Sequence, residues 1–275
     1  MPEPRPVIIH QPAGTGISPV VFDNPHSAPS ESWLWDAFID RLLADVPGTG
    51  IPVLETEISR TIIDTNREIA EIDPSVFQEP WPHPHRLTAN VRKGMGLIPF
   101  LIKRPDGSLV QTFNEGSQIT VAEVKKRIDE YYTPYYNALI NLVNNAKQHH
   151  GVSVHFNFHS IPRLDAPLDK DIIIGDLYGK AASPLLVKFV RDFMRREHLS
   201  VGMNKPYPGG ALIRATANPA QGQHSLQIEI ARDLYMDQSS LTYDTKKGNQ
   251  VRDMLTRFAA ELQTFTRAQT VALRP

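Results

Sequence analysis

Short runs of apolar residues alternate along the chain with longer stretches in which apolar residues recur every three or four positions. The short runs predict β-strands, and several are nearly continuous in valine and isoleucine, as buried strands of parallel sheets tend to be. They are Val7–His10, Pro19–Asp23, Ile51–Glu55, Leu97–Ile102, Ser153–Phe158, Asp171–Gly175, Ala211–Ala215 and Ser225–Ala231.

The periodic stretches predict helices between these strands. They are Glu31–Val46, Thr120–His149, Pro184–Glu197 and Gly248–Ala268. The first would follow Ser30 as its N-cap, and Pro134 should kink or divide the second. Strands that alternate with helices indicate an α/β fold with a mostly parallel sheet, here a single domain over residues 1–275.

Composition narrows the chemistry that this fold could carry. The chain of 275 residues has no cysteine, which excludes disulfides, thiolate zinc sites and cysteine nucleophiles. Any metal must therefore be held by aspartate, glutamate or the 10 histidines. A net charge of −1 argues against nucleic-acid binding. No run approaches the ~18–20 apolar residues of a membrane span, and the N-terminus lacks a signal-peptide core, so we expect a cytoplasmic protein.

Histidines follow two of the predicted strands. His26 comes just after the strand Pro19–Asp23, which would fix the position of a metal ligand, although a hydrogen-bonding loop histidine would look the same. His155, Asn157 and His159 alternate with aromatic residues, so they share one strand face. His159 is the better ligand candidate because it stands at the strand end, whereas Asn157 could hold an imidazole in position.

A carboxylate occupies an apolar strand near its end. Glu229 shares a face of the strand Ser225–Ala231 with Gln227. A buried carboxylate is costly unless it is paired or functional, and beside a metal it would be a natural general base. The structural alternative is an ion pair between Glu229 and Arg232.

The segment Asp64-Thr65-Asn66-Arg67 offers groups suited to binding a carboxylate. Arginine presents a planar fork of donors, and asparagine adds a neutral donor. Asp64 could orient Asn66 or a neighbouring arginine, and a surface turn is the alternative. By contrast, His83-Pro84-His85 lies among prolines and predicts a surface loop.

Taken together and in order, several of these segments resemble the N-formylglutamate amidohydrolase (N-formylglutamate deformylase) family. They are Asn24–Ser27, Ile63–Arg67, Gly94–Ile98, Phe158–Ser160, Pro206–Gly210 and Gln227–Asp237. The last is the most specific. The resemblance implies a three-layer α/β/α sandwich around a mostly parallel mixed sheet, like that of the zinc exopeptidases and the wider phosphorylase/hydrolase-like fold.

The resemblance also implies a zinc ion, with His26 and His159 as ligands. The wider superfamily takes another ligand from a His-x-x-Glu pair, but Pro29 stands at that position and Glu31 is out of register. The family has an aspartate ahead of a helix near this place, which makes Asp36 the third ligand. Asn157 stands where the family often has aspartate, which would change the support of His159.

The implied reaction is hydrolysis of the formamide bond of N-formyl-L-glutamate to formate and L-glutamate, usually within histidine degradation. Glu229 would be the general base that activates a zinc-bound water. Asn66 and Arg67 would bind the substrate α-carboxylate. Arg163 and Arg214 are candidates, by position only, for a cation that stabilises the oxyanion. Another basic group, among Arg232, Arg92 and Arg86, would bind the substrate side chain.

Other functions remain open at this point. The nearest is a zinc amidase or deacylase for another N-acyl amino acid, which would share the fold and metal. A non-catalytic binding member of the same fold is a second. A serine hydrolase using Ser27 or Ser160 is disfavoured because neither lies in a Gly-x-Ser-x-Gly elbow. In the enzymatic cases the partner is a small N-acyl amino acid.

Overall fold

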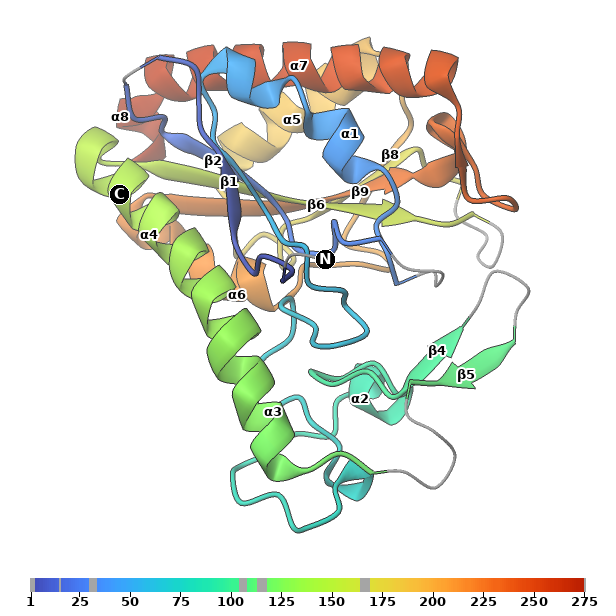
Figure 1. Ribbon diagram of the computed structural model, residues 1–275. Coiled ribbons are helices and arrows are strands. Elements are labelled where there is room, and N and C mark those ends of the chain that lie inside the picture. Colours follow the sequence, from blue (N-terminus) through green and yellow to red (C-terminus); the bar gives the residue numbers. More distant parts are fainter. Residues whose placement is uncertain are drawn as a thin grey trace.

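A twisted seven-stranded sheet forms the centre of the computed structural model, in the order β1-β3-β2-β6-β9-β7-β8 (Figure 1). The structure describes residues 3–14, 16–29, 34–103, 108–112, 118–163 and 169–274. The strands are β1 (Ile8–His10), β2 (Val20–Asn24), β3 (Val53–Glu55), β6 (Ser153–Ile161), β7 (Ile172–Gly175), β8 (Val201–Met203) and β9 (Gln223–Ala231). The adjacent strands β3, β2, β6 and β9 are parallel, whereas β1 and β7 run antiparallel to β3 and β9.

One face of the sheet is apolar and is covered by α1 (Ile39–Leu43), α5 (Pro184–Arg196) and α7 (Thr245–Ala268) (Figure 1). Alternate residues of the central strands point to this face because side chains of a strand alternate between its two sides. The aromatic rings that meet there belong to Phe22, Phe156, Phe158, Phe193 and Phe258. These rings are fully buried, so this face carries the main hydrophobic core.

The opposite face is covered by α4 (Thr133–His150) and α6 (Ala211–Thr216). The short helix α8 (Thr270–Leu273) follows α7. Val21 and Leu54 of the sheet pack there against Leu139 of α4 and Leu212 of α6. Helices on both faces make a three-layer α/β/α sandwich around a mixed, mostly parallel sheet, which confirms the predicted fold class.

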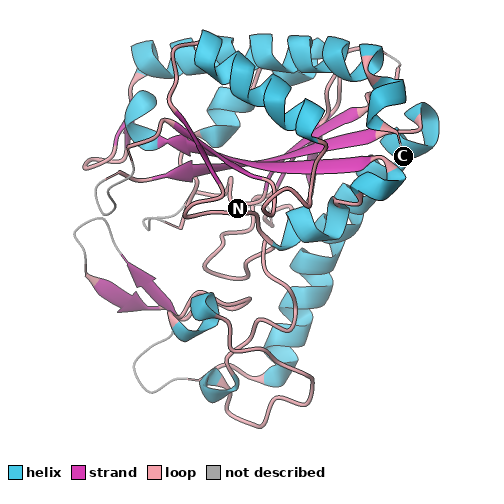
Figure 2. Cartoon of the chain, turned by 180° about the vertical axis from the view of Figure 1, so that it is seen from behind, coloured by secondary structure: helices cyan, strands magenta, loops and turns pink. Residues whose placement is uncertain are grey.

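The chain between β3 and α4 lies below the sheet (Figure 2). Its side chains form a second hydrophobic cluster. Its regular elements are α2 (Ala89–Arg92), the antiparallel strands β4 (Leu101–Lys103) and β5 (Leu109–Gln111), and α3 (Val121–Arg127). Ile63, Phe77, Trp81 and Leu97 are among its buried members. The expectation of one domain over residues 1–275 stays a prediction.

Short elements connect these layers. They are the 3-10 turns Val46–Thr49, Pro74–Val76, Pro219–Gln221 and Arg232–Leu234 and the paired strands β10 (Met236–Asp237) and β11 (Thr242–Tyr243). A π-helical turn, Ile128–Tyr132, separates α3 from α4 just before Pro134, so the predicted break in this helix is confirmed. Within the described ranges, no helix has the length and apolarity that crossing a membrane requires.

Three predicted elements are wrong in type or extent. The run Ala211–Ala215 is not a strand but helix α6, since a short apolar run suits either element and the preceding glycines lead into a helical turn. Of the predicted run Leu97–Ile102, only Leu101 and Ile102 lie in a strand, as part of β4, which pairs with β5. The chain from Leu97 to Pro99 instead reaches the second cluster as a loop, where Leu97 is buried.

The predicted helix Glu31–Val46 is reduced to α1, Ile39–Leu43. Residues 30–33, which include the proposed cap Ser30, the third-ligand alternative Glu31 and Trp33, lie outside the described residues. A hydrogen bond from the Asp36 amide to the His26 carbonyl, over 3.1 Å, holds the chain before α1. This tertiary contact replaces the helical hydrogen bonding that the local pattern of apolar residues predicts.

Candidate metal centre and active site

The polar face of the sheet collects functional side chains where the parallel strands end. His26 lies two residues beyond β2, and His159 lies near the end of β6. Glu229 of β9 is the direct register partner of His159. Sites in α/β sheets form at the carboxyl ends of parallel strands, because the loops that follow them meet there. The alternation predicted for His155, Asn157 and His159 therefore places all three on the functional face.

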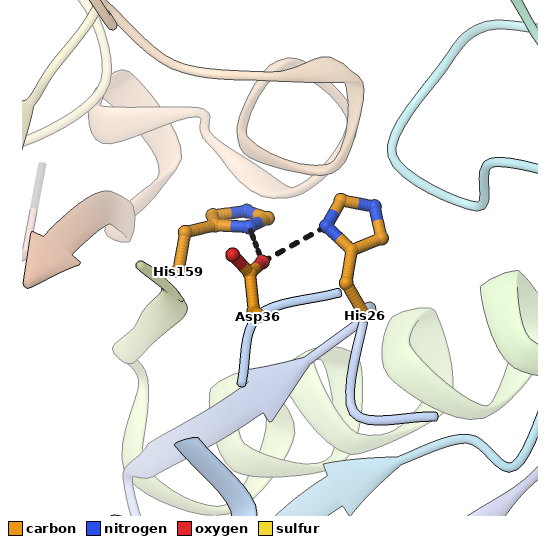
Figure 3. A group of neighbouring side chains, drawn as sticks. All are labelled: His26, Asp36 and His159. Atoms are coloured by element: carbon orange, nitrogen blue, oxygen red, sulfur yellow. Dashed lines mark hydrogen bonds and ion pairs between the residues drawn. The ribbon is translucent and has the colours of Figure 1, made fainter. Parts of the chain in front are cut away.

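His26, Asp36 and His159 point toward one another (Figure 3). The Nδ1 atom of His26 lies 3.0 Å from Oδ2 of Asp36, and Nδ1 of His159 lies 2.7 Å from the same oxygen. One ligand atom from each residue lies within 4.8 Å of the other two, and all three side chains are buried. Two imidazoles and one carboxylate form a donor set that suits a divalent metal such as Zn²⁺.

Asp36 is fixed by more than the histidines. Its Oδ1 accepts hydrogen bonds from the amide and the hydroxyl of Ser160, both over 2.9 Å. Burial alone would raise the pKa of Asp36, but the charges and hydrogen bonds of His159 and His26 hold that pKa well below its usual range. Asp36 is therefore a carboxylate at neutral pH, as a metal ligand must be.

The Nε2 atoms of the two histidines, which point away from Asp36, contact different residues. Nε2 of His26 lies 2.9 Å from the Asp64 carboxylate, which also pairs with Arg60 over 2.7 Å. Nε2 of His159 lies 2.6 Å from the amide oxygen of Asn157. Both ring orientations are thus set by a second residue, which is typical of metal-binding histidines.

Glu229 is a buried carboxylate that accepts a hydrogen bond from a neighbouring side chain of its own strand. The Gln227 side-chain amide donates to its Oε1 over 2.7 Å. Burial raises the pKa of Glu229 to about 7, although His159 and Arg60 favour the charged form. Arg232 uses its guanidinium to donate to the Ser160 hydroxyl and the Trp35 carbonyl. A carboxylate with a pKa near neutrality can both take up and release a proton.

Two residues that the sequence analysis missed act electrostatically on this centre. The positive charge of Arg60 bears on Asp36 and Glu229 as well as on Asp64. Burial and the negative charges of Glu229 and Asp36 raise the pKa of the Tyr207 phenol to about 12. Both come from loops, so strand alternation could not place them. The Pro206–Gly210 motif was the one available signal for Tyr207.

Asn66 and Arg67 lie beside the centre with part of their hydrogen-bonding capacity engaged. Asn66 accepts from the Leu212 amide over 3.1 Å, and its Nδ2 lies 3.0 Å from His159 Nε2 and 3.4 Å from Asn157 Oδ1. Arg67 donates to the carbonyls of Met95 and Asn66. Their expected role in binding a substrate carboxylate stays a prediction.

Arg163 and Arg214 are engaged in ion pairs. Arg163 pairs with Asp171 and Asp233. Arg214 pairs with Glu68 over 3.0 Å and has a side chain that is 43% exposed. Of the cations near the centre, the electrostatic neighbours of Glu229 include Arg60 rather than either of these. Their expected role at the oxyanion stays a prediction.

The remaining candidate groups serve the structure. The Ser27 hydroxyl donates to the Thr56 carbonyl over 2.7 Å and accepts from the Thr56 amide, while Ser160 supports Asp36. Neither hydroxyl is paired with a histidine base, which argues against a serine nucleophile. His83 and His85 lie in an exposed loop, which confirms the surface interpretation.

Comparisons with known proteins show which family this chain resembles. The sequence profile of N-formylglutamate amidohydrolase matches residues 5–236. N-formylglutamate deformylase from Pseudomonas putida is 24% identical over 244 residues, covering 85% of this chain and 83% of the relative. The same-named protein from Pseudomonas aeruginosa is 25% identical over 245 residues, covering 86% and 84%.

A solved structure supports the fold over nearly its full length. The crystal structure of N-formylglutamate amidohydrolase from Ralstonia eutropha JMP134 is similar with a TM-score of 0.85 and 30% sequence identity. The similarity covers 96% of this chain and 99% of that one.

Proposed function

The chain belongs to the N-formylglutamate amidohydrolase family, and on that basis we propose that it hydrolyses N-formyl-L-glutamate to formate and L-glutamate. The observation that carries this proposal is the buried His26, Asp36 and His159 group beside Glu229. The names of the relatives support a hydrolase acting on a formamide. A small N-acyl amino acid would be the partner.

The residues present fit a zinc ion. His26 and His159 would offer Nδ1, because both Nδ1 atoms face the Asp36 carboxylate, and Asp36 would be the third ligand. When bound there, zinc would supply a Lewis acid that polarises the formyl carbonyl and acidifies water. The outer contacts of both histidines with Asp64 and Asn157 support such a site by holding the rings in place.

Glu229 would handle the protons. As a carboxylate it takes a proton from the attacking water, whose oxygen forms a bond with the formyl carbon. It then passes that proton to the amide nitrogen as the carbon–nitrogen bond breaks, so formate and the free amine leave. The raised pKa of about 7 suits a group that both accepts and donates a proton near neutral pH. The Gln227 amide keeps the carboxylate oriented.

Arg60 is the cation best placed to stabilise negative charge on the formyl oxygen. It is partly buried beside Asp64, and its charge bears on both Asp36 and Glu229. A fixed charge in a site with little water stabilises a developing oxyanion strongly. Arg67 and Asn66 would hold the substrate α-carboxylate at the next position, since an arginine fork matches a carboxylate.

The decisive variant is Glu229→Gln, which keeps the size of the side chain and removes its ability to accept a proton. We expect formate release from N-formyl-L-glutamate to fall by about 10²–10⁴-fold while the zinc content stays unchanged. Glu261→Gln, a surface change on α7, is the matched control and should keep full activity. Near-normal turnover by the Glu229 variant would remove it from the base role.

The substrate is tested separately with a panel of N-formyl and N-acetyl amino acids. Release of formate from N-formyl-L-glutamate with the highest kcat/KM supports the proposal. Zinc binding with hydrolysis of another N-acyl amino acid would keep the amidohydrolase and change its substrate. No zinc and no hydrolysis, even after zinc is added, would favour a non-catalytic binding protein.

A further inference from the structure

A line of buried polar side chains leads from the interior of the sheet to His159. Asp23 of β2 and Asn157 of β6 are register partners, and their side chains are joined by a hydrogen bond from Asn157 Nδ2 to Asp23 Oδ1 of 2.8 Å. Asp23, His155 and Asn157 have no exposed surface. None of the three is among the group of side chains that could hold a metal. Their contacts therefore indicate what they do.

Asp23 is held firmly in place. Its Oδ1 also contacts His155 Nε2 at 2.7 Å, and its Oδ2 accepts a hydrogen bond from the Tyr135 hydroxyl over 2.8 Å. Polar groups on both carboxylate oxygens fix the plane of this side chain. These partners are required, because burying a carboxylate without hydrogen-bond partners costs a large free energy.

This carboxylate dictates which way the Asn157 amide faces. A carboxamide carries a donor at one end and an acceptor at the other, and the two ends have nearly the same shape. An ionised carboxylate only accepts, so the NH₂ end of Asn157 must face Asp23. The amide oxygen is then turned toward His159, where it lies 2.6 Å from Nε2.

The amide oxygen in turn selects the state of His159. An acceptor at that distance requires a proton on Nε2, and a neutral imidazole with Nε2–H keeps its lone pair on Nδ1. Nδ1 is the atom that faces Asp36. The nearby Asn66 amide, which also lies close to Nε2, then donates to the Asn157 oxygen and adds to its fixation.

We propose that Asp23 is a positioning residue for the metal centre: by fixing the Asn157 amide, it determines that His159 binds the metal through Nδ1. This inference rests on the zinc site of the proposed function. It also gives a physical reason for an asparagine at position 157. An aspartate there would place a second carboxylate against Asp23, whereas the amide can donate to Asp23 and accept from His159.

The test compares zinc binding by the wild-type protein, three single variants and one double variant, using competition with a chelator at fixed pH. In Asp23→Asn, residue 23 can present either an oxygen or an NH₂ group, so it no longer dictates the orientation of Asn157. We expect its zinc dissociation constant to rise by about 10–100-fold. Tyr135→Phe is the matched control, because it removes a donor from the other oxygen of Asp23 without touching Asn157.

The control should retain zinc affinity within about threefold even where its melting temperature falls, which separates positioning from general destabilisation. Asn157→Ser removes the amide and leaves Asp23 intact, so it tests the same path if Asp23→Asn fails to fold. It should weaken zinc binding to the same extent. The double variant, Asp23→Asn with Asn157→Ser, should then bind zinc as tightly as Asn157→Ser alone, because Asp23 acts only through Asn157.

A spectroscopic readout identifies the nitrogen directly. In the zinc-loaded protein labelled with ¹⁵N-histidine, the nitrogen shifts of His159 should show Nδ1 bound to zinc and a slowly exchanging Nε2–H. In Asp23→Asn the Nε2–H should exchange faster. Unchanged zinc affinity and unchanged exchange in that variant would overturn the proposal. Additive losses in the double variant would do the same. A wild-type protein that binds no zinc would instead overturn the proposed function on which the inference rests.

Discussion

The two faces of β6 differ although they are built by neighbouring residues of one strand. Phe156 and Phe158 point to the face covered by α7, where Phe156 lies 5.4 Å from the ring of Phe258. Asn157 and His159 point the other way, where their shortest contacts are polar ones of 2.6–2.8 Å. Because side chains alternate along a strand, one face of β6 packs in the hydrophobic core and the other carries the candidate site residues. Substitutions on the two faces should affect different measurements.

The largest effect is expected on the polar face, from His159→Ala. The variant removes one of the three candidate ligands, so zinc should no longer bind stoichiometrically and formate release should fall to background. Metal analysis of the purified variant, paired with a formate assay, measures both. His85→Ala, in an exposed loop, is the matched histidine control and should keep zinc and activity. Stoichiometric zinc in His159→Ala would contradict the ligand assignment.

The reverse effect is expected on the apolar face, from Phe156→Ala. Phe156 is fully buried among aromatic rings, so its truncation leaves a cavity and should lower the free energy of unfolding by about 3–5 kcal/mol. The folded variant should bind zinc with the wild-type stoichiometry. Chemical denaturation and metal analysis test the two statements. Val271→Ala, at an 84% exposed position, should change stability by less than about 0.5 kcal/mol.

The difference between the faces also explains which site residues could be predicted from the sequence alone. Strand alternation placed Asn157 and His159 on one face, and the solitary carboxylate of Glu229 stood out within an apolar run. These inferences needed only local periodicity, which the central strands obey. Asp36 came from the family resemblance, because its position depends on contacts with His26 and Ser160 that are distant in sequence.

Residues outside the strands were harder to predict. Arg60 and Tyr207 reach the centre from loops. Nothing in their local sequence reports neighbours more than 100 residues away, which are Glu229 for Arg60 and Asp36 for Tyr207. The role of Asp23 depends on its pairing with β6, which the sequence does not give. The run Ala211–Ala215 shows the same limit, since its helical form follows from packing rather than from composition.

A smaller effect concerns pH. Burial raises the pKa of Glu229 to about 7, so the carboxylate loses its basic form as the pH falls through that value. We expect kcat/KM to be constant above this pKa and to fall about tenfold per pH unit below it. The profile is measured as initial rates of formate release with zinc held saturating. Thermal melting at each pH distinguishes titration from unfolding. A flat profile down to pH 5 would show that Glu229 does not titrate near pH 7 in the zinc-loaded enzyme.

The smallest effect is expected from Gln227, which supports Glu229 on the polar face. Gln227 lies two residues before Glu229, donates to it over 2.7 Å, and accepts from the Gly210 amide over 2.7 Å. Gln227→Leu removes the donor that favours the carboxylate, so the acidic limb of the pH profile should move upward. A hydrogen bond of ~1 kcal/mol corresponds to a shift of ~0.5–1 pH unit.

Gln227→Glu separates this effect from displacement of the Gly210 loop. The glutamate can still accept from the Gly210 amide, but it cannot donate to Glu229 and it adds a like charge beside it. The acidic limb should therefore move further in the same direction, because two adjacent carboxylates resist joint ionisation. A limb that moves in Gln227→Leu but not in Gln227→Glu would show that the loop, and not the hydrogen bond, controls the base.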